Sequence, residues 1–256
     1  MTLLSSTNLC VRIGGVEVCR GLDLALDACQ RWALLGANGS GKTTLLHTLG
    51  GLRPPQGGEI RVDGTPLATW PRKALACRVG VLFQDSQDTF PGTVLETALR
   101  GRHPHLPFWA VEGRTDLDLA HAALRDVQLE ELAGRSVDTL SGGERRRLAI
   151  ATLIAQQPDI WLLDEPTNHL DLRHQVTLLE LIARRVTGRN GVMMAALHDV
   201  NLALRCCTHA ALLLGAGEVL TGSADEVISE GNLERLYRHP VRCLRSEDGR
   251  RFYVPA

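Results

Sequence analysis

The chain has 256 residues, of which 44% are hydrophobic, and its 28 lysines and arginines nearly balance 29 acidic residues. This balance excludes a strongly basic surface, so neither nucleic acid nor an anionic membrane is expected as the main partner. Apolar segments such as 192–197 and 210–214 are far shorter than the roughly 20 residues of a membrane-spanning helix, and no basic leader precedes the first strand-like segment. Seven cysteines without a C-x-x-C pair fit neither a disulfide framework nor a zinc site. We therefore expect a cytosolic protein with one elaborated domain.

In chain order, the N-terminal third predicts strands and turns. Residues 3–35 contain short apolar segments separated by glycine or aspartate, which predicts antiparallel strands at 9–13, 16–18, 22–26 and 32–35. A helix is predicted at 42–49, and strands follow at 59–62 and 78–83. From 93 to 157 the apolar residues recur at spacings of three and four, which predicts a helical lobe inserted into the sheet domain.

Sheet signals return after the helical segment. Strands are predicted at 160–163, 192–197 and 210–214, with helices at 175–186 and 200–206 between them. Alternation of strands and helices predicts a parallel, doubly wound α/β core. Strand-like pieces at 241–244 and 252–254 follow, and no role is predicted for them.

A phosphate-binding loop is predicted where an apolar strand meets a helix. The segment from Gly36 to Thr43, GANGSGKT, fits the pattern G-x-x-x-x-G-K-[ST]. The glycines allow the backbone N–H groups and the helix N-terminus to face phosphate oxygens. Lys42 is expected to reach the β- and γ-phosphates, and the Thr43 hydroxyl is expected to bind Mg²⁺. The nucleotide-binding residues predicted here are Gly36, Asn38, Gly39, Ser40, Gly41, Lys42, Thr43 and Thr44.

Two acidic residues end the apolar strand that begins at Ile160. In such sheets nucleotides bind at the carboxyl ends of the strands, so Asp164 is expected to hold Mg²⁺. Glu165, the next residue, is placed to polarise the water that attacks the γ-phosphate, which is a general-base role. Together with the phosphate loop, this pair predicts nucleotide hydrolysis.

A third motif, Leu140 to Glu144 (LSGGE), precedes a long helical segment. Ser141, Gly142 and Gly143 offer a hydroxyl and backbone N–H groups to an anion at a helix start. This motif resembles the signature of the ABC ATPases, although the family more commonly has glutamine at the position of Glu144. The resemblance implies that the anion is the γ-phosphate of ATP bound to the opposite protomer.

The resemblance covers residues 3 to about 225 and extends to further positions. It implies a P-loop NTPase (RecA-like) core with an N-terminal antiparallel β-subdomain and an α-helical subdomain inserted at about 86–157, within an ATPase domain of residues 1–235 and before a short extension, 236–256. Gln84 resembles the glutamine that contacts Mg²⁺ or the attacking water, and His198 resembles the switch histidine at the γ-phosphate. The segment from Asn168 to Asp171 resembles the one that crosses the dimer interface, where Asp171 would contact nucleotide.

Ile13 departs from the family pattern, because that position usually stacks an aromatic ring on adenine. We expect weaker base stacking and relaxed selectivity between ATP and GTP.

The resemblance also implies an assembly. Two protomers would form a head-to-tail homodimer that holds two ATP with Mg²⁺, and a transmembrane permease would dock near residues 85–91. Segments 93–96, 101–105 and 198–203 are similar to those of importers of metal chelates, namely iron-siderophore, haem and cobalamin. The chain is thus expected at the cytoplasmic face of the inner membrane as a peripheral subunit, linked indirectly to a substrate-binding protein.

Other functions stay open at this point. A soluble ABC ATPase of translation or DNA repair is one alternative, although such proteins carry two cassettes or long coiled coils, and this chain has one set of motifs and no heptad repeat. A motor of an importer or exporter for another substrate is a second. A binding module without hydrolysis is a third, and the presence of Lys42, Asp164, Glu165 and His198 together argues against it.

Overall fold

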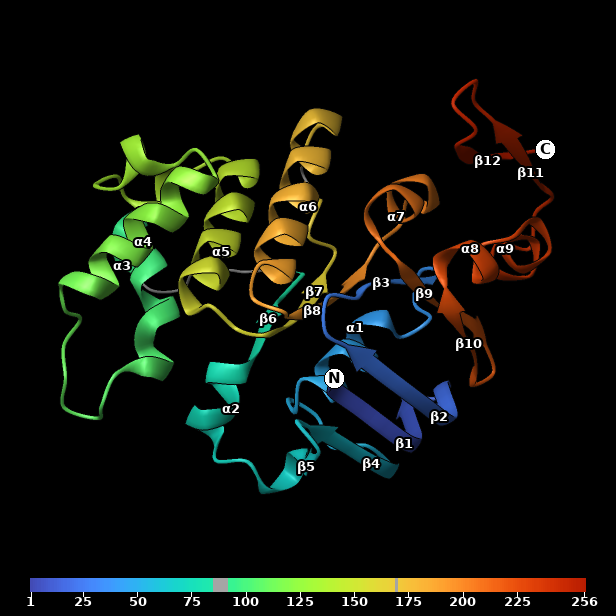
Figure 1. Ribbon diagram of the computed structural model, residues 1–256, viewed down its shortest axis with the longest axis horizontal. Helices are drawn as coiled ribbons and strands as arrows, with labels where there is room; N and C mark the ends of the chain where they lie inside the picture. The colour runs from blue at the N-terminus through green and yellow to red at the C-terminus, as the bar shows by residue number, and fades with distance from the viewer. Residues whose placement is uncertain (85–91, 169) are drawn as a thin grey trace.

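The structure, a computed structural model, describes residues 1–84, 92–168 and 170–256, and its centre is a six-stranded sheet (Figure 1). The strands lie in the order β10-β9-β3-β8-β7-β6. Their bounds are Arg31–Gly36 (β3), Val79–Leu82 (β6), Ile160–Asp164 (β7), Val192–Ala196 (β8), His209–Gly215 (β9) and Glu218–Ser223 (β10). Strands β9 to β6 pair in parallel, and β10 is antiparallel to β9. The predicted parallel core is therefore confirmed.

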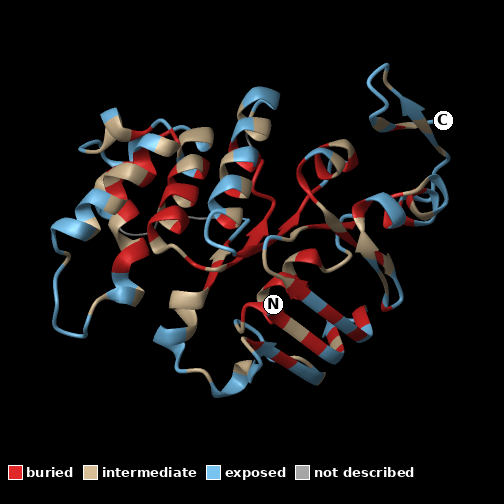
Figure 2. Ribbon diagram, in the orientation of Figure 1, coloured by how far each residue is buried: buried red, intermediate tan, exposed pale blue. Residues whose placement is uncertain are grey.

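Helices cover both faces of this sheet, so successive residues of a central strand enter different cores. In β3, Trp32 and Leu34 pack with helix α1 (Lys42–Leu49), whereas Ala33 and Leu35 pack in the core that includes α6 (Leu172–Thr187) and α7 (Val200–Cys206). Every residue of β7 and β8 is buried, as expected for strands covered on both faces (Figure 2).

A second, antiparallel sheet is formed by the N-terminal strands in the order β2-β1-β4-β5. Their bounds are Thr2–Ile13 (β1), Val16–Asp27 (β2), Gly57–Val62 (β4) and Thr65–Pro66 (β5). The prediction of several short strands was wrong here: shifts in the β1–β2 register absorb interruptions such as Gly21, whose φ is +63°, so each strand continues for 12 residues. The segment 32–35 was also wrongly placed among antiparallel strands, because β3 pairs in parallel with β8 and β9.

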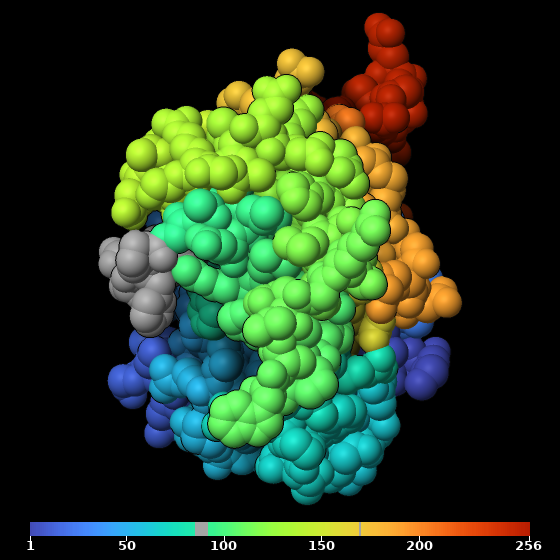
Figure 3. Space-filling view, turned by 90° about the vertical axis from the view of Figure 1, so that its left-hand side faces the viewer, coloured from blue at the N-terminus to red at the C-terminus, as the bar shows by residue number. Residues whose placement is uncertain are grey.

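The helical lobe lies beside the sheet and covers one side of the molecule (Figure 3, green). Its helices are α3 (Val94–Leu99), α4 (Arg114–Asp126) and α5 (Gly142–Gln156), with short 3-10 turns η2 (Arg100–His105), η3 (Glu130–Leu132) and η4 (Val137–Thr139). They pack around a core that includes Ala98, Leu124 and Leu148. The lobe follows β6, the edge strand of the six-stranded sheet. Two short elements, η1 (Leu67–Thr69) and α2 (Arg72–Arg78), precede that strand. Helix α2 was not predicted, and Arg78 ends it rather than beginning a strand.

The C-terminal part contains elements that the sequence reading missed. Helices α8 (Ala224–Val227) and α9 (Glu230–Tyr237) follow β10, and the predicted strand-like pieces form a hairpin of β11 (Val241–Arg245) and β12 (Arg251–Pro255). The hairpin stands out from the rest of the chain and is largely exposed (Figure 2). Within the described ranges, no helix is long and apolar enough to cross a membrane.

Candidate functional site

The phosphate loop connects β3 to α1, and its conformation depends on glycine. Gly39 and Gly41 have φ angles of +75° and +95°, and a Cβ at Gly41 would lie 2.4 Å from the Cγ2 of Val18. Lys42, at the first turn of α1, is buried, and its Nζ donates to the carbonyls of Gly36 at 2.8 Å and Ala37 at 3.3 Å. Burial lowers the pKa of Lys42, against the attraction of Glu165 and Asp164. The ammonium group is thus held by its own loop.

Asp164 ends β7 as a fully buried carboxylate. Neither of its oxygens has a hydrogen-bond partner among the described residues. Burial raises the pKa of Asp164, and the Thr43 hydroxyl, which lies nearby without a well-formed hydrogen bond, partly offsets this effect. A buried carboxylate without a protein partner is costly unless a cation neutralises it. The carboxylate of Asp164 and the hydroxyl of Thr43 are oxygen donors of the kind that Mg²⁺ prefers, so these residues fit the predicted metal.

Glu165 is held by three side chains that donate to its carboxylate. The Nε2 of His198 lies 2.6 Å from Oε1, while Oε2 accepts from the amide of Gln84 at 3.1 Å and from the amide of Asn168. Its φ of +48° is disfavoured for a residue with a Cβ, at a cost of about 1–3 kcal/mol that the surroundings must offset. Burial acts to raise the pKa of Glu165, but the contacts with His198 and Asn168 outweigh it and leave the pKa lowered. The carboxylate is therefore ionised and oriented, as a general base requires.

Most of the predicted residues line one open cavity of about 670 Å³, whereas Gly36 and the fully buried Asp164 are not among its lining residues. The structure brings together, as its lining, the predicted residues Asn38, Gly39, Ser40, Gly41, Lys42, Thr43, Thr44, Gln84, Glu165 and His198. Ile13 also lines the cavity and presents an aliphatic side chain rather than a ring. The volume of this cavity falls within the range usual for small-molecule sites.

The signature residues do not line this cavity. Ser141 is the N-cap of α5 and forms a reciprocal capping box with Glu144, whose carboxylate accepts from the Ser141 N–H and hydroxyl, both at 2.7 Å. Ser141 and Gly142 are exposed, and Gly143 is half-buried. Asp171 is the N-cap of α6 and is also exposed. These four predicted residues thus present helix starts at the surface, away from the cavity of their own chain.

Arg146 is a positioning residue that the sequence reading missed. The residue is 4% exposed, and its guanidinium donates to the carbonyls of Phe83 and Gln84 on one segment and of Asp164, Glu165 and Pro166 on another. It therefore joins helix α5 of the lobe to both segments that carry the acidic and glutamine side chains. The signal was present, because Arg146 lies four and seven residues before the buried Ile150 and Leu153, on the inner face of the helix.

Asn168 was predicted only as part of an interface segment, yet its amide contacts Glu165 directly. Two predictions fall outside the described residues: the permease surface at 85–91, and His169 within the interface segment.

The comparisons with known proteins agree with this geometry. Residues 19–168 match the family model described as "ABC transporter". The chain is 36% identical over 247 residues to the ferric enterobactin transport ATP-binding protein FepC of Escherichia coli (strain K12), covering 96% of this chain and 90% of FepC. It is 40% identical over 248 residues to the hemin import ATP-binding protein HmuV of Myxococcus xanthus (strain DK1622), covering 91% and 92% of the two chains. Among solved structures, it is similar to a metal-chelate type ABC transporter in an inward-facing conformation, with a TM-score of 0.86, 28% identity and coverage of 100% and 98%.

Proposed function

Because the chain belongs to the ABC transporter family, we propose that it is the ATP-hydrolysing subunit of an importer that takes up a metal chelate. The family and the P-loop ATPase fold were both predicted from the sequence, and both predictions are confirmed. The observation that carries the catalytic part of the proposal is the carboxylate of Glu165, which is ionised, oriented by three donors and placed at the phosphate-loop cavity.

In this proposal each side chain has a defined role in hydrolysis. Glu165 accepts the proton of the attacking water, and His198 and Gln84 hold its carboxylate and face the same cavity. Lys42 leaves its loop carbonyls to contact the β- and γ-phosphates. Thr43, Asp164 and Gln84 would hold Mg²⁺, which neutralises phosphate charge when bound.

We infer that the site is completed by a second copy of the chain. Ser141, Gly142, Gly143 and Asp171 lie at exposed helix starts and do not line the nucleotide cavity of their own chain. The N-terminus of a helix favours anions, so in a head-to-tail homodimer Ser141 and the backbone N–H groups of Gly142 and Gly143 would contact the γ-phosphate bound by the partner subunit, and Asp171 would contact that nucleotide at the interface. Two ATP would then join the two subunits, and hydrolysis would release them.

The cargo is proposed from the relatives. Ferric enterobactin and hemin are named in the relatives that match nine-tenths of this chain, and the solved structure is of the metal-chelate type. Iron-siderophore or haem is therefore proposed ahead of cobalamin. A separate permease would cross the membrane, with this chain bound at its cytoplasmic face and a substrate-binding protein as an indirect partner.

Growth on a single iron source tests the cargo. A strain that lacks this gene is expected to stop growing on haem or on one ferric siderophore, to recover with the wild-type gene and to stay deficient with Glu165→Gln. Normal growth of the deletion strain on every metal chelate would contradict the proposed cargo while leaving the ATPase assignment intact.

A further inference from the structure

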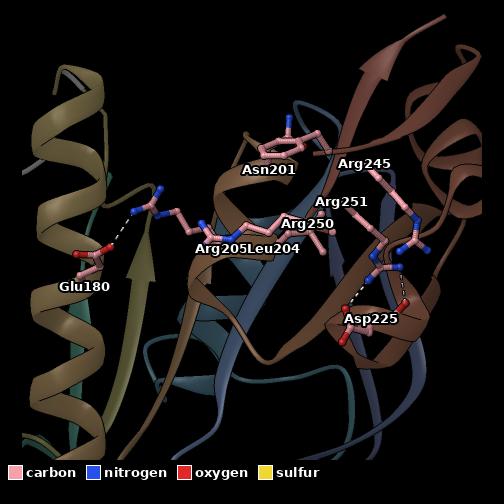
Figure 4. A pocket seen from close by; sticks show the side chains of 10 residues that line it. Glu180, Asn201, Leu204, Arg205, Asp225, Arg245, Arg250 and Arg251 are labelled. Carbon is pink, nitrogen blue, oxygen red and sulfur yellow. Dashed lines mark hydrogen bonds and ion pairs between the residues drawn. The ribbon is translucent and has the colours of Figure 1, made fainter. Parts of the chain in front are cut away.

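A second cavity, of about 780 Å³, lies between helix α7 and the C-terminal hairpin (Figure 4). It shares no lining residue with the nucleotide cavity. Four arginines and two carboxylates line it: Arg205, Arg245, Arg250, Arg251, Glu180 and Asp225. The lining therefore carries a net positive charge of two on a chain whose overall charge is −1.

Two of the arginines are held in place by the two carboxylates, as the dashed lines in Figure 4 show. Arg205 lies 3.2 Å from the Oε1 of Glu180 on α6, and Arg251 contacts the carboxylate and the main-chain carbonyl of Asp225. These pairs fix the direction of two guanidinium groups and leave part of each group's donor capacity unused.

Of the other two arginines, Arg245 supplies the uncompensated charge. Arg250 is paired with Asp248, which is not part of the lining, with Nε and Oδ2 3.0 Å apart. The side chain of Arg245 forms no ion pair or hydrogen bond with the residues that the structure describes. A guanidinium group without a counter-charge attracts an anion, and a concave wall strengthens that attraction.

The hairpin that carries three of these arginines is fixed to helix α7. The side-chain amide of Asn201 donates to the carbonyl of Tyr253 at 3.1 Å and accepts from its N–H at 2.8 Å, as a strand neighbour would. The Tyr253 hydroxyl, in turn, donates to the carbonyl of Ile228 at 2.7 Å. The two walls of the cavity, the hairpin and helix α7, are therefore held at a defined separation. Helix α7 begins two residues after His198.

We propose that this cavity binds a small phosphate-bearing ligand. Arginine matches phosphate because its planar donors form paired hydrogen bonds with two oxygens, and four arginines around one concave site exceed what the local carboxylates neutralise. Phe252 and Leu204 add an apolar part to the lining, and Phe252 is 42% exposed. A flat, exposed ring beside a cationic wall suits a nucleotide, whose base stacks while its phosphates pair with the arginines.

Calorimetric titration of the full chain tests the site. Lys42→Ala serves as the background for all titrations, because it disables the phosphate loop, which would otherwise bind the same probes. The probes are inorganic pyrophosphate and adenosine 3′,5′-bisphosphate. We expect one molecule bound per chain, and Arg245→Ala is expected to weaken binding at least tenfold. Arg242→Ala, in the same strand but outside the cavity lining, is the matched control and is expected to leave binding unchanged.

The two probes separate the two sources of phosphate. Tighter binding of the bisphosphate, lost in Phe252→Ala, identifies a nucleotide ligand, whereas equal affinities identify recognition of phosphate alone. Absence of binding by both probes, or equal weakening by Arg245→Ala and Arg242→Ala, would overturn the proposal. Circular dichroism of each variant establishes that the chain is folded. These outcomes do not bear on ATP hydrolysis, so they leave the proposed function untouched.

Discussion

Arg146→Lys separates the shape of the buried guanidinium from its charge. The arginine reaches five main-chain carbonyls, and a lysine ammonium group has only three donor hydrogens, so at least two carbonyls lose their donor. A buried acceptor without a donor costs about 1–3 kcal/mol, so the free energy of unfolding is expected to fall by about 3 kcal/mol. For a chain of this length, that corresponds to a Tm lower by about 6–12 °C.

Thermal unfolding and steady-state ATP hydrolysis measure the two consequences. Because Arg146 holds the carbonyls of Gln84 and Glu165, kcat is expected to fall by about tenfold, which is about 1.4 kcal/mol of activation free energy. Arg145→Lys is the matched control, since the neighbouring Arg145 is exposed, and its effect on unfolding is expected within about 0.5 kcal/mol. If Arg146→Lys unfolds at the wild-type temperature with wild-type kcat, the guanidinium does not join the lobe to the site as argued.

Three further variants test separate parts of the account. In His198→Ala, Glu165 loses a hydrogen-bond donor that lowers its pKa, so the pKa of Glu165 is expected to rise. The acid limb of the pH–rate profile should therefore move to higher pH. An unchanged acid limb would count against the contact between His198 and Glu165. Ile13→Tyr supplies the missing ring. Because base stacking contributes about 1 kcal/mol or more, ATP binding is expected to tighten about fivefold, and GTP is expected to compete less well in a displacement assay. Equal competition by GTP in the wild type and the variant would refute the role of Ile13. Asn201→Ala removes both hydrogen bonds between helix α7 and Tyr253 of the hairpin, so trypsin should cleave the hairpin several times faster than in the wild type. Equal cleavage rates would show that other contacts hold the hairpin.

The parts of the site that the sequence predicted are those encoded locally. The phosphate loop depends on glycines that must adopt left-handed φ angles immediately before a helix, so spacing alone identifies it. The acidic pair is placed by a fully apolar strand that has to lie inside a covered sheet. Both signals lie within a few consecutive residues, and the structure places the phosphate loop and Glu165 at one cavity.

The parts that the sequence did not predict depend on residues far apart in the chain. Arg146 contacts carbonyls more than 60 positions earlier, at Phe83 and Gln84, which no local pattern indicates. The arginine-lined cavity joins α6, α7 and the hairpin, and it forms where the hairpin docks on helix α7 through Asn201. The sequence predicted several short N-terminal strands instead of two long ones, because glycine is typical both of a β-bulge within a strand and of a turn between strands.

Glu165→Gln, compared with the wild-type chain, tests the central claim most directly. The measurement is steady-state ATP hydrolysis, with size-exclusion chromatography in Mg-ATP to detect the dimer. The account predicts that the wild type hydrolyses ATP, while the variant is inactive and accumulates as an ATP-bound dimer. Equal hydrolysis by both proteins, with no dimer in either, would contradict the role of Glu165 as the base and the site shared between two subunits.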